Sequence, residues 1–180
     1  MSMKLGIIGF GGMGKFHSKQ APKAGVTVIG AADIKEERVQ EAIEAGIKGY
    51  HSADELLADP EINTVILTVP NHLHKEMAIK AAKAGKNVIT EKPAALNVAE
   101  LDEMTKACEE AGVCFTTHQN RRWDRDMLTV KKAYETGNGL IIMRAKTDII
   151  DIQSGITKGR NLSNRTLVKV PYLRVANVQR

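Results

Sequence analysis

The chain has 180 residues, which is enough for one domain, or for one domain and part of a second. Hydrophobic residues make up 43% and charged residues 26%, a globular composition, and no uncharged apolar run approaches the roughly 20 residues that cross a bilayer, so we expect no membrane insertion. The net charge of +5 arises entirely after residue 150, where six basic residues face one acid, so the body of the chain is not basic and we expect no nucleic-acid partner.

The first residues lead directly into a strand-like pattern, without the basic segment, apolar stretch and small-residue cleavage site of an export signal. The chain has two cysteines, Cys108 and Cys114, in no CxxC arrangement. We therefore predict a reducing, cytoplasmic location, with both cysteines acting as small core residues.

Short runs rich in β-branched residues alternate with amphipathic helical stretches over residues 1–122. This alternation predicts an α/β fold with a doubly wound parallel sheet covered by helices on both faces. The predicted strands lie near residues 4–8, 26–31, 48–50, 64–69, 87–89 and 113–117.

Helix ends have recognisable signals. Glycine follows most helical stretches, as expected for a left-handed residue after a helix C-terminus. Plausible capping boxes pair Ser52 with Glu55 and Asn97 with Glu100. One predicted apolar face, at helical spacing, should belong to the core. The glycines are Gly25, Gly46, Gly85, Gly112 and Gly137, and the face comprises Leu101, Met104, Cys108 and Ala111.

The first predicted strand ends in a complete GxGxxG pattern that precedes a helix, namely Gly9-Phe10-Gly11-Gly12-Met13-Gly14. In this context Gly9 permits a tight turn, Gly11 lets the backbone approach a pyrophosphate, and Gly14 lets helix and strand pack closely. The N–H groups at the helix start would then bind the anion. A glycine-rich turn without a ligand is the alternative.

Asp33 ends the second predicted strand, nineteen residues after Gly14, where an acid is expected to accept hydrogen bonds from the adenosine ribose. A carboxylate there would repel a 2'-phosphate, which favours NAD over NADP. Lys35 and Arg38 follow closely and could attract that phosphate, so NADP stays possible. Alternatively, Asp33 is only a helix N-cap that pairs with Glu36.

Three further segments follow predicted strand ends, on the side of an open α/β sheet that lines the ligand crevice. By composition each could be a turn, and Lys92 alone could be a solvated loop lysine. The segments are Thr68-Val69-Pro70-Asn71-His72-Leu73-His74, Glu91-Lys92-Pro93 and His118-Gln119-Asn120-Arg121-Arg122.

Taken in order, these motifs resemble the Gfo/Idh/MocA family of oxidoreductases, the glucose-fructose oxidoreductase and inositol dehydrogenase type. The resemblance covers about residues 3–148, and the set is more specific than any single motif. It rests on GFGGMG at Gly9, on Asp33, on VPNHLH at Val69, on EKP at Glu91 and on QNRRWD at Gln119.

The resemblance implies roles for single residues. Val69, Pro70 and Asn71 would line the cofactor near its ribose units, with Thr68 and His74 in the same cofactor-binding segment, and Glu91 would lie by the nicotinamide ribose. Lys92 would lie between nicotinamide and substrate and hold or polarise the reacting hydroxyl. Asn120 would touch the nicotinamide end.

The implied activity is hydride transfer between the nicotinamide and a carbinol carbon of a sugar, polyol or related small molecule. In the family the accompanying base commonly belongs to a DxGxH-like segment of a second domain, which this chain lacks. A dinucleotide-binding module without turnover, whether truncated, decayed or redox-sensing, is the second hypothesis. A full-length form is expected to be a homo-oligomer.

The domain organisation follows from these patterns. Residues 1–122 are predicted to form the dinucleotide-binding Rossmann domain, and residues 123–180 a linking helix and the incomplete start of an α+β substrate and oligomerisation domain. A helix is expected near 124–136 and a strand-like run from Leu140. After Asp151 the periodicity is lost and the charge is one-sided, which indicates a truncated or non-native tail, such as a shifted reading frame produces.

A metal site is not expected. The two closely spaced histidines, His72 and His74, lie two residues apart and so do not share a helix face, and spacing places no third ligand beside them.

Overall fold

The computed structural model describes residues 2–136, 142–144, 148–151 and 166–167. It divides the chain between Gln119 and Asn120 into two compact units, three residues before the predicted boundary. Each unit is described by itself. Among the described residues, no helix is both long and apolar enough to cross a membrane.

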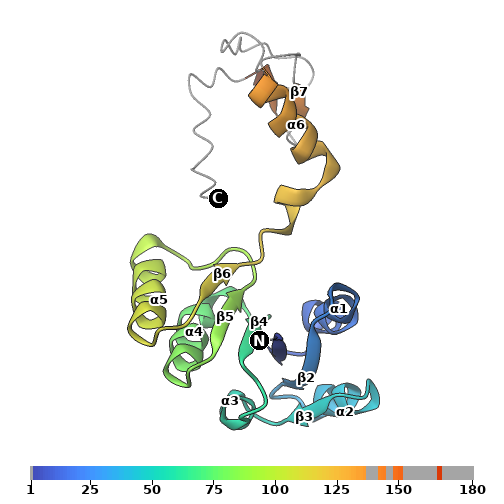
Figure 1. The fold of residues 1–180 in the computed structure, drawn as a ribbon, viewed down its shortest axis with the longest axis vertical. Helices are drawn as coiled ribbons and strands as arrows, with labels where there is room; N and C mark the ends of the chain where they lie inside the picture. The colour runs from blue at the N-terminus through green and yellow to red at the C-terminus, as the bar shows by residue number, and fades with distance from the viewer. Residues whose placement is uncertain (1, 137–141, 145–147, 152–165, 168–180) are drawn as a thin grey trace. The chain divides into compact units, whose positions relative to one another are not determined.

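The first unit is built on a six-stranded sheet in the order β3-β2-β1-β4-β5-β6, in which every neighbouring pair is parallel (Figure 1). This order is that of a Rossmann fold, so the predicted fold class is confirmed. The strands are β1 (Lys4–Ile8), β2 (Thr27–Ala32), β3 (Lys48–Tyr50), β4 (Thr64–Leu67), β5 (Asn87–Thr90) and β6 (Phe115–Thr117).

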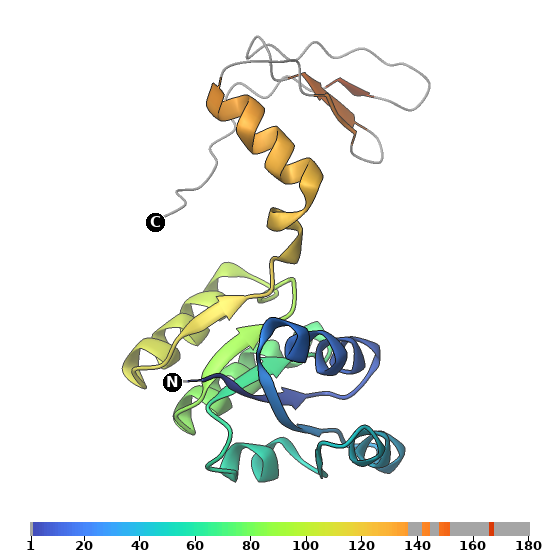
Figure 2. The ribbon, with the colours of Figure 1, turned by 45° about the vertical axis from the view of Figure 1, so that its right-hand side comes forward.

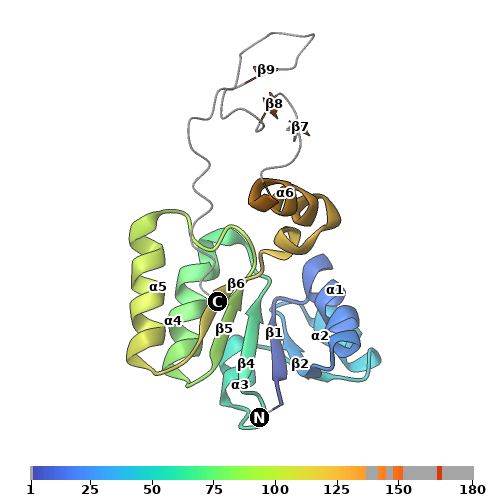
Figure 3. The same cartoon turned by 45° about the horizontal axis from the view of Figure 1, so that its top comes forward.

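Helices cover both faces of this sheet, as Figures 2 and 3 show, with α1 and α2 on one side and α4 and α5 on the other. The first face buries a smaller core around Ile7, Phe10 and Ile66, and the second a larger core around Leu56, Leu67 and Met104. The helices are α1 (Gly12–Gln20), η1 (Ala21–Ala24), α2 (Glu36–Glu44), α3 (Ala53–Ala58), η2 (Asn71–Leu73), α4 (His74–Lys83) and α5 (Val98–Glu110).

The predicted helix ends form largely as expected. Gly25, Gly46, Gly85 and Gly112 all have positive φ, and Gly137 lies outside the described residues. Both predicted N-caps accept the expected amide, Ser52 from Glu55 and Asn97 from Glu100. The glutamates, however, accept the amides of His51 and Leu96, one residue before each cap, so the capping boxes are offset by one residue.

Several expectations differ from the structure, among them the start of β6, which lies at Phe115 rather than Val113. β4 ends at Leu67 rather than Val69, although the Thr68 amide still donates to the Ile8 carbonyl and its hydroxyl donates to the carbonyl of Gly9, the residue after β1. Ala111 is the exposed C-cap of α5 and not part of its buried face. Cys108 is buried as predicted, whereas Cys114 is exposed, because it precedes β6 in a loop.

The second unit begins with a short 3-10 helix, η3 (Asn120–Trp123), and α6 (Arg125–Thr136), close to the predicted linking helix. Beyond it, the described residues include three short strands, β7 (Ile142–Arg144), β8 (Asp148–Asp151) and β9 (Thr166–Leu167). Strand β7 runs antiparallel to β8. β7 lies in the strand-like run that the sequence predicts to start at Leu140, a residue outside the described set.

Candidate functional site

The candidate site lies along the carboxyl ends of the parallel strands. The register aligns the last residues of five strands, Ala32, Ile8, Leu67, Thr90 and Thr117, in the order β2-β1-β4-β5-β6. The residues that come next therefore form a row along one edge of the sheet. This row consists of Asp33, Gly9, Thr68, Glu91 and His118.

The glycine loop occupies the middle of the row, where the strand order reverses between β1 and β4. Ligands of open α/β sheets bind at such a point. Gly9 has a φ of 95°, and a Cβ there would lie 2.9 Å from the Thr68 carbonyl oxygen. A Cβ on Gly14 would collide with the carbonyl oxygen of Gly9. Both glycines are thus required by close backbone packing.

Gly11 differs, because a Cβ there would meet only the side chain of Arg38, at 3.7 Å from its Nη1. Gly11 is the N-cap of α1, and the first turn of that helix contains no acidic residue. Its amides have no carbonyl partner within the helix, and the helix dipole favours an anion there. The open space beside Gly11 and these donors fit a diphosphate.

Asp33 is a buried carboxylate that organises the loop. Its Oδ2 accepts the Phe10 N–H at 2.8 Å and lies 3.1 Å from Nη1 of Arg38, while its Oδ1 accepts the Lys35 N–H at 3.0 Å. The N-cap of α2 is Lys35, so Asp33 does not cap that helix, and the alternative role is wrong.

Phe10 fills the smaller core, with 2% of its surface exposed. Its amide already donates to Asp33, so the donors that remain for a diphosphate begin at Gly11. Met13, next along the loop, is 41% exposed, and Gly12 is also exposed.

The loop after β4 presents Pro70 and Asn71 to solvent, with Thr68 and Val69 half-buried. His74 is fully buried behind it, with Nε2 3.1 Å from the Val69 carbonyl oxygen and Nδ1 3.0 Å from that of Pro93. Its side chain therefore joins the two loops that follow β4 and β5, so we assign it a positioning role.

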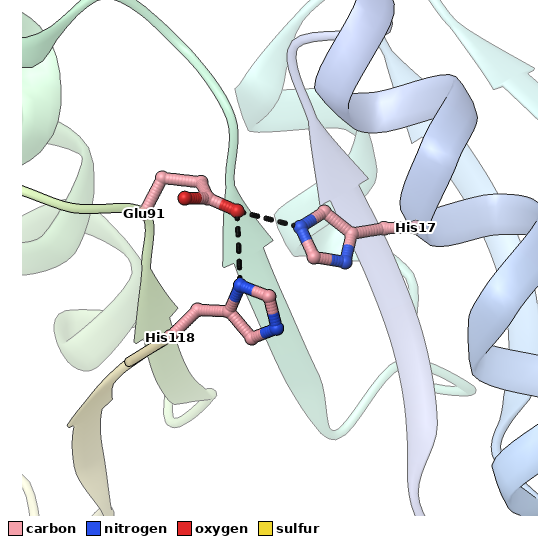
Figure 4. Close-up of side chains that lie close together, drawn as sticks. All are labelled: His17, Glu91 and His118. Atoms are coloured by element: carbon pink, nitrogen blue, oxygen red, sulfur yellow. Dashed lines mark hydrogen bonds and ion pairs between the residues drawn. The ribbon is translucent and has the colours of Figure 1, made fainter. Parts of the chain in front are cut away.

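Glu91 lies at the end of β5 between two histidines (Figure 4). Its Oε1 lies 2.7 Å from Nε2 of His17, on α1, and 3.1 Å from Nδ1 of His118, after β6. Its Oε2 accepts the N–H of Lys92 at 3.2 Å. Burial alone would raise the pKa of Glu91, but the hydrogen bonds from His17 and the Lys92 amide and the charge of His118 lower it below its ordinary value.

Sequence reasoning placed Glu91 in the site but missed His17, and it named His118 only as part of a segment. One ring nitrogen of each histidine and one carboxylate oxygen of Glu91, atoms of the kind that bind metal ions, lie within 4.8 Å of one another. Because Oε1 already accepts a hydrogen bond from each ring, the arrangement is satisfied without an ion. A histidine one helical turn after the glycine motif was the available signal.

Two predicted residues stand apart from this description. Lys92 is exposed at the same edge, immediately after Glu91, as a residue that meets a substrate should be. Asn120 is the first residue of the second unit, so its expected contact with the nicotinamide stays a prediction.

Residues 3–119 match the model of the oxidoreductase family with an NAD-binding Rossmann fold, GFO_IDH_MocA. Among curated relatives, myo-inositol 2-dehydrogenase of Thermotoga maritima is 36% identical over 75% of this chain and 41% of its own length. The NADP(+)-dependent scyllo-inositol 2-dehydrogenase IolW of Bacillus subtilis is 34% identical over 76% of this chain and 38% of its own length.

Two solved structures are similar as well. The WlbA dehydrogenase of Bordetella pertussis, in complex with NADH and UDP-GlcNAcA, has a TM-score of 0.73 at 32% identity, over 79% of this chain and 45% of that one. An NAD-binding protein of Listeria innocua has a TM-score of 0.73 at 38% identity, over 76% of this chain and 41% of that one. The chain spans about two fifths of the length of the curated relatives. With the ordered row of site residues, the match over 3–119 shows that the chain belongs to the Gfo/Idh/MocA family of oxidoreductases.

Proposed function

We propose that this chain is the coenzyme-binding part of an NAD(P)-dependent dehydrogenase that acts on a sugar, polyol or related small molecule. The single observation that carries the proposal is the row at the sheet edge: Asp33 for the adenosine ribose, the Gly9 loop for the diphosphate, and Glu91 for the nicotinamide ribose. These groups stand in the order of the coenzyme's own parts. Relatives named as inositol dehydrogenases support the substrate class.

The coenzyme, when bound, supplies the hydride acceptor or donor. The residues of this chain orient it and act on the hydroxyl. Asp33, as a buried carboxylate, favours the two ribose hydroxyls of NAD, while Arg38 beside it is able to meet a 2'-phosphate. An ammonium at Lys92 stabilises alkoxide character at the substrate oxygen, and Glu91 holds the backbone amide of Lys92 in place.

Coenzyme binding by the 180-residue chain tests the first half of the proposal. Isothermal titration should give a micromolar dissociation constant for NADH. Gly11→Val should weaken binding about tenfold or more, because the side chain fills the space meant for the diphosphate, while the thermal midpoint barely changes. The absence of heat with both coenzymes, on folded protein, would refute the proposal.

Turnover needs a substrate domain, which a chimera supplies: residues 1–119 replace the matching segment of Thermotoga maritima myo-inositol 2-dehydrogenase. With myo-inositol, the change in absorbance at 340 nm should appear, and Lys92→Ala should abolish it while NADH binding stays nearly intact. Lys83→Ala, on the exposed end of α4, is the matched control and should keep full turnover. Unchanged turnover in Lys92→Ala would remove Lys92 from the catalytic role.

Two further proposals concern the whole protein. We place it in the cytoplasm, to which both free cysteines are suited. We also expect a homo-oligomer in a form that includes a substrate domain, which light scattering on the chimera would reveal.

A further inference from the structure

The two histidines beside Glu91 come from segments far apart in the chain. His17 lies on α1, 74 residues before Glu91, and His118 follows β6, 27 residues after it. His17 and Glu91 are 7% and 6% exposed, and the two imidazole rings meet edge to face with centroids 4.7 Å apart. Figure 4 shows both rings turned toward the same carboxylate oxygen.

This cluster is small and its charge is easily counted. An ionised Glu91 with two neutral histidines has a net charge of −1, and each histidine protonation adds one positive charge. Histidine changes its charge between about pH 5 and pH 8, whereas a carboxylate held by hydrogen bonds stays ionised there. Because His17 and Glu91 are buried, a nearby charge is screened less than it would be in water.

One neighbouring group changes this count by a constant amount, because the Lys92 ammonium adds one positive charge whichever protonation state the two histidines have. The elements that meet here contribute His17 from α1, Glu91 and Lys92 from the end of β5, and His118 from the end of β6. Gly9 and Thr68, which follow β1 and β4 in the row beside Glu91, do not ionise. Phe16 packs its ring edge to face with His17, and Asp33 is paired with Arg38 at the far end of the row.

We propose that His17 and His118 are specificity-determining residues that set the relative affinity of this site for the oxidised and the reduced nicotinamide coenzyme. The inference rests on the proposed function, which places Glu91 beside the nicotinamide ribose. The two forms differ by one positive charge on the nicotinamide ring. Each proton that the cluster takes up raises its charge by one and so disfavours the cationic ring of NAD⁺. The neutral ring of NADH is indifferent to the change.

The sign of the pH effect follows. NAD⁺ binds best to the unprotonated cluster, so its binding should release protons, and its affinity should fall as the pH is lowered and the cluster takes up protons. From pH 7.5 to pH 5.5 we expect about a tenfold loss of NAD⁺ affinity, with NADH changed less than about twofold. The ratio of the two dissociation constants is therefore the informative quantity.

The experiment is isothermal titration of the whole chain with NAD⁺ and with NADH between pH 5.5 and pH 8. Two buffers of different ionisation enthalpy at each pH count the protons released. His17→Gln and His118→Asn each keep an N–H donor near the position of the ring nitrogen that faces Glu91 but do not titrate. The double variant should bind NAD⁺ with a pH dependence no steeper than that of NADH. His51→Gln, at an exposed histidine paired with Glu36, is the matched control and should behave as the parent protein.

The outcomes separate the two proposals. If both coenzymes bind the parent protein with the same pH dependence and the same proton count, the inference is overturned and the proposed function stands. If neither coenzyme binds folded protein at any pH, both fall. Should the double variant not fold, the proton count of the parent protein and the single His118→Asn variant, whose parent side chain is 30% exposed, still decide the question.

Discussion

Asp33 is the residue at which coenzyme preference should be most easily changed. Its buried carboxylate takes part in three contacts, with the Phe10 amide, the Lys35 amide and the Arg38 guanidinium. The first two shape the loop and go to different carboxylate oxygens, so an asparagine side chain could accept one of the two amides but would face the other with its NH2 group. The negative charge pairs with Arg38, and under the proposed function it would also accept hydrogen bonds from the ribose hydroxyls and repel a 2'-phosphate.

Asp33→Asn should therefore lower NADH affinity about tenfold, through loss of a charged acceptor for the ribose, and should raise NADPH affinity relative to NADH. The freed Arg38 would then meet the 2'-phosphate. Titration with both reduced coenzymes measures the ratio. Asp54→Asn, at an exposed acid that pairs with Lys80, should leave it unchanged. A ratio that stays constant in Asp33→Asn would assign the preference to other residues.

The place of the candidate site in the fold was predictable where one chain segment defines it, and the roles of its residues stay predictions. The GxGxxG pattern and Asp33 lie beside strand ends, and a strand end is readable from β-branched runs and glycines. His17 was not predictable in this way, because its partner Glu91 lies 74 residues away and the two meet only once α1 packs beside the row. The sequence around Asp33 also fits a helix N-cap, and that role is excluded only because the N-cap of α2 in the structure is Lys35.

At the scale of elements, the loop between α3 and β4 is held to β3 by a compact polar group. Asp59 Oδ2 accepts the Tyr50 hydroxyl at 2.6 Å and lies 2.9 Å from the Lys48 ammonium, while its Oδ1 accepts the Glu61 amide. These hydrogen bonds, among which the one from Tyr50 has the largest effect, lower the pKa of Asp59 to about 2. Burial and the same carboxylate raise the pKa of Tyr50 to about 12. The group thus fixes an edge strand of three residues.

The lowered pKa sets a pH window for stability. A carboxyl whose pKa is lower in the folded chain stabilises it above its unfolded pKa of about 3.9 and loses that contribution as pH falls toward about 2. Asp59→Asn should lower the free energy of unfolding at pH 7 by about 1 kcal/mol, since the pair with Lys48 is partly solvated.

Denaturant unfolding of both proteins at pH 7, 4 and 3 measures this difference, which should shrink as the pH falls. Asp102→Asn, at an exposed acid of α5, is the control and should show a small difference at each pH. A difference for Asp59→Asn that is equal at pH 7 and pH 3 would contradict the assignment.

For the molecule as a whole, the alternation of strands and helices was enough to predict the doubly wound sheet, because a parallel order with helical crossovers has few alternatives. The ends of elements were less predictable. Thr68 lies just after β4, where its hydroxyl donates to the carbonyl of Gly9, the residue after β1, and that contact depends on the register of the two strands. The division into two compact units lies after Gln119, and the predicted domain boundary at residue 122 stays a prediction.

Both hydrophobic cores consist of residues before Gln119, and so do the glycine loop, Asp33 and the Glu91 cluster. The first unit therefore has what a domain needs to fold and what the proposed site needs to bind. We predict that a fragment of residues 1–119 unfolds in a single cooperative transition and binds NADH within about threefold of the whole chain, a difference below 1 kcal/mol. Circular dichroism during urea unfolding and isothermal titration provide the two measurements. A folded fragment whose NADH affinity is tenfold weaker would show that contacts beyond Gln119 matter, and Asn120→Ala in the whole chain would then identify the predicted nicotinamide contact if it reproduced the loss.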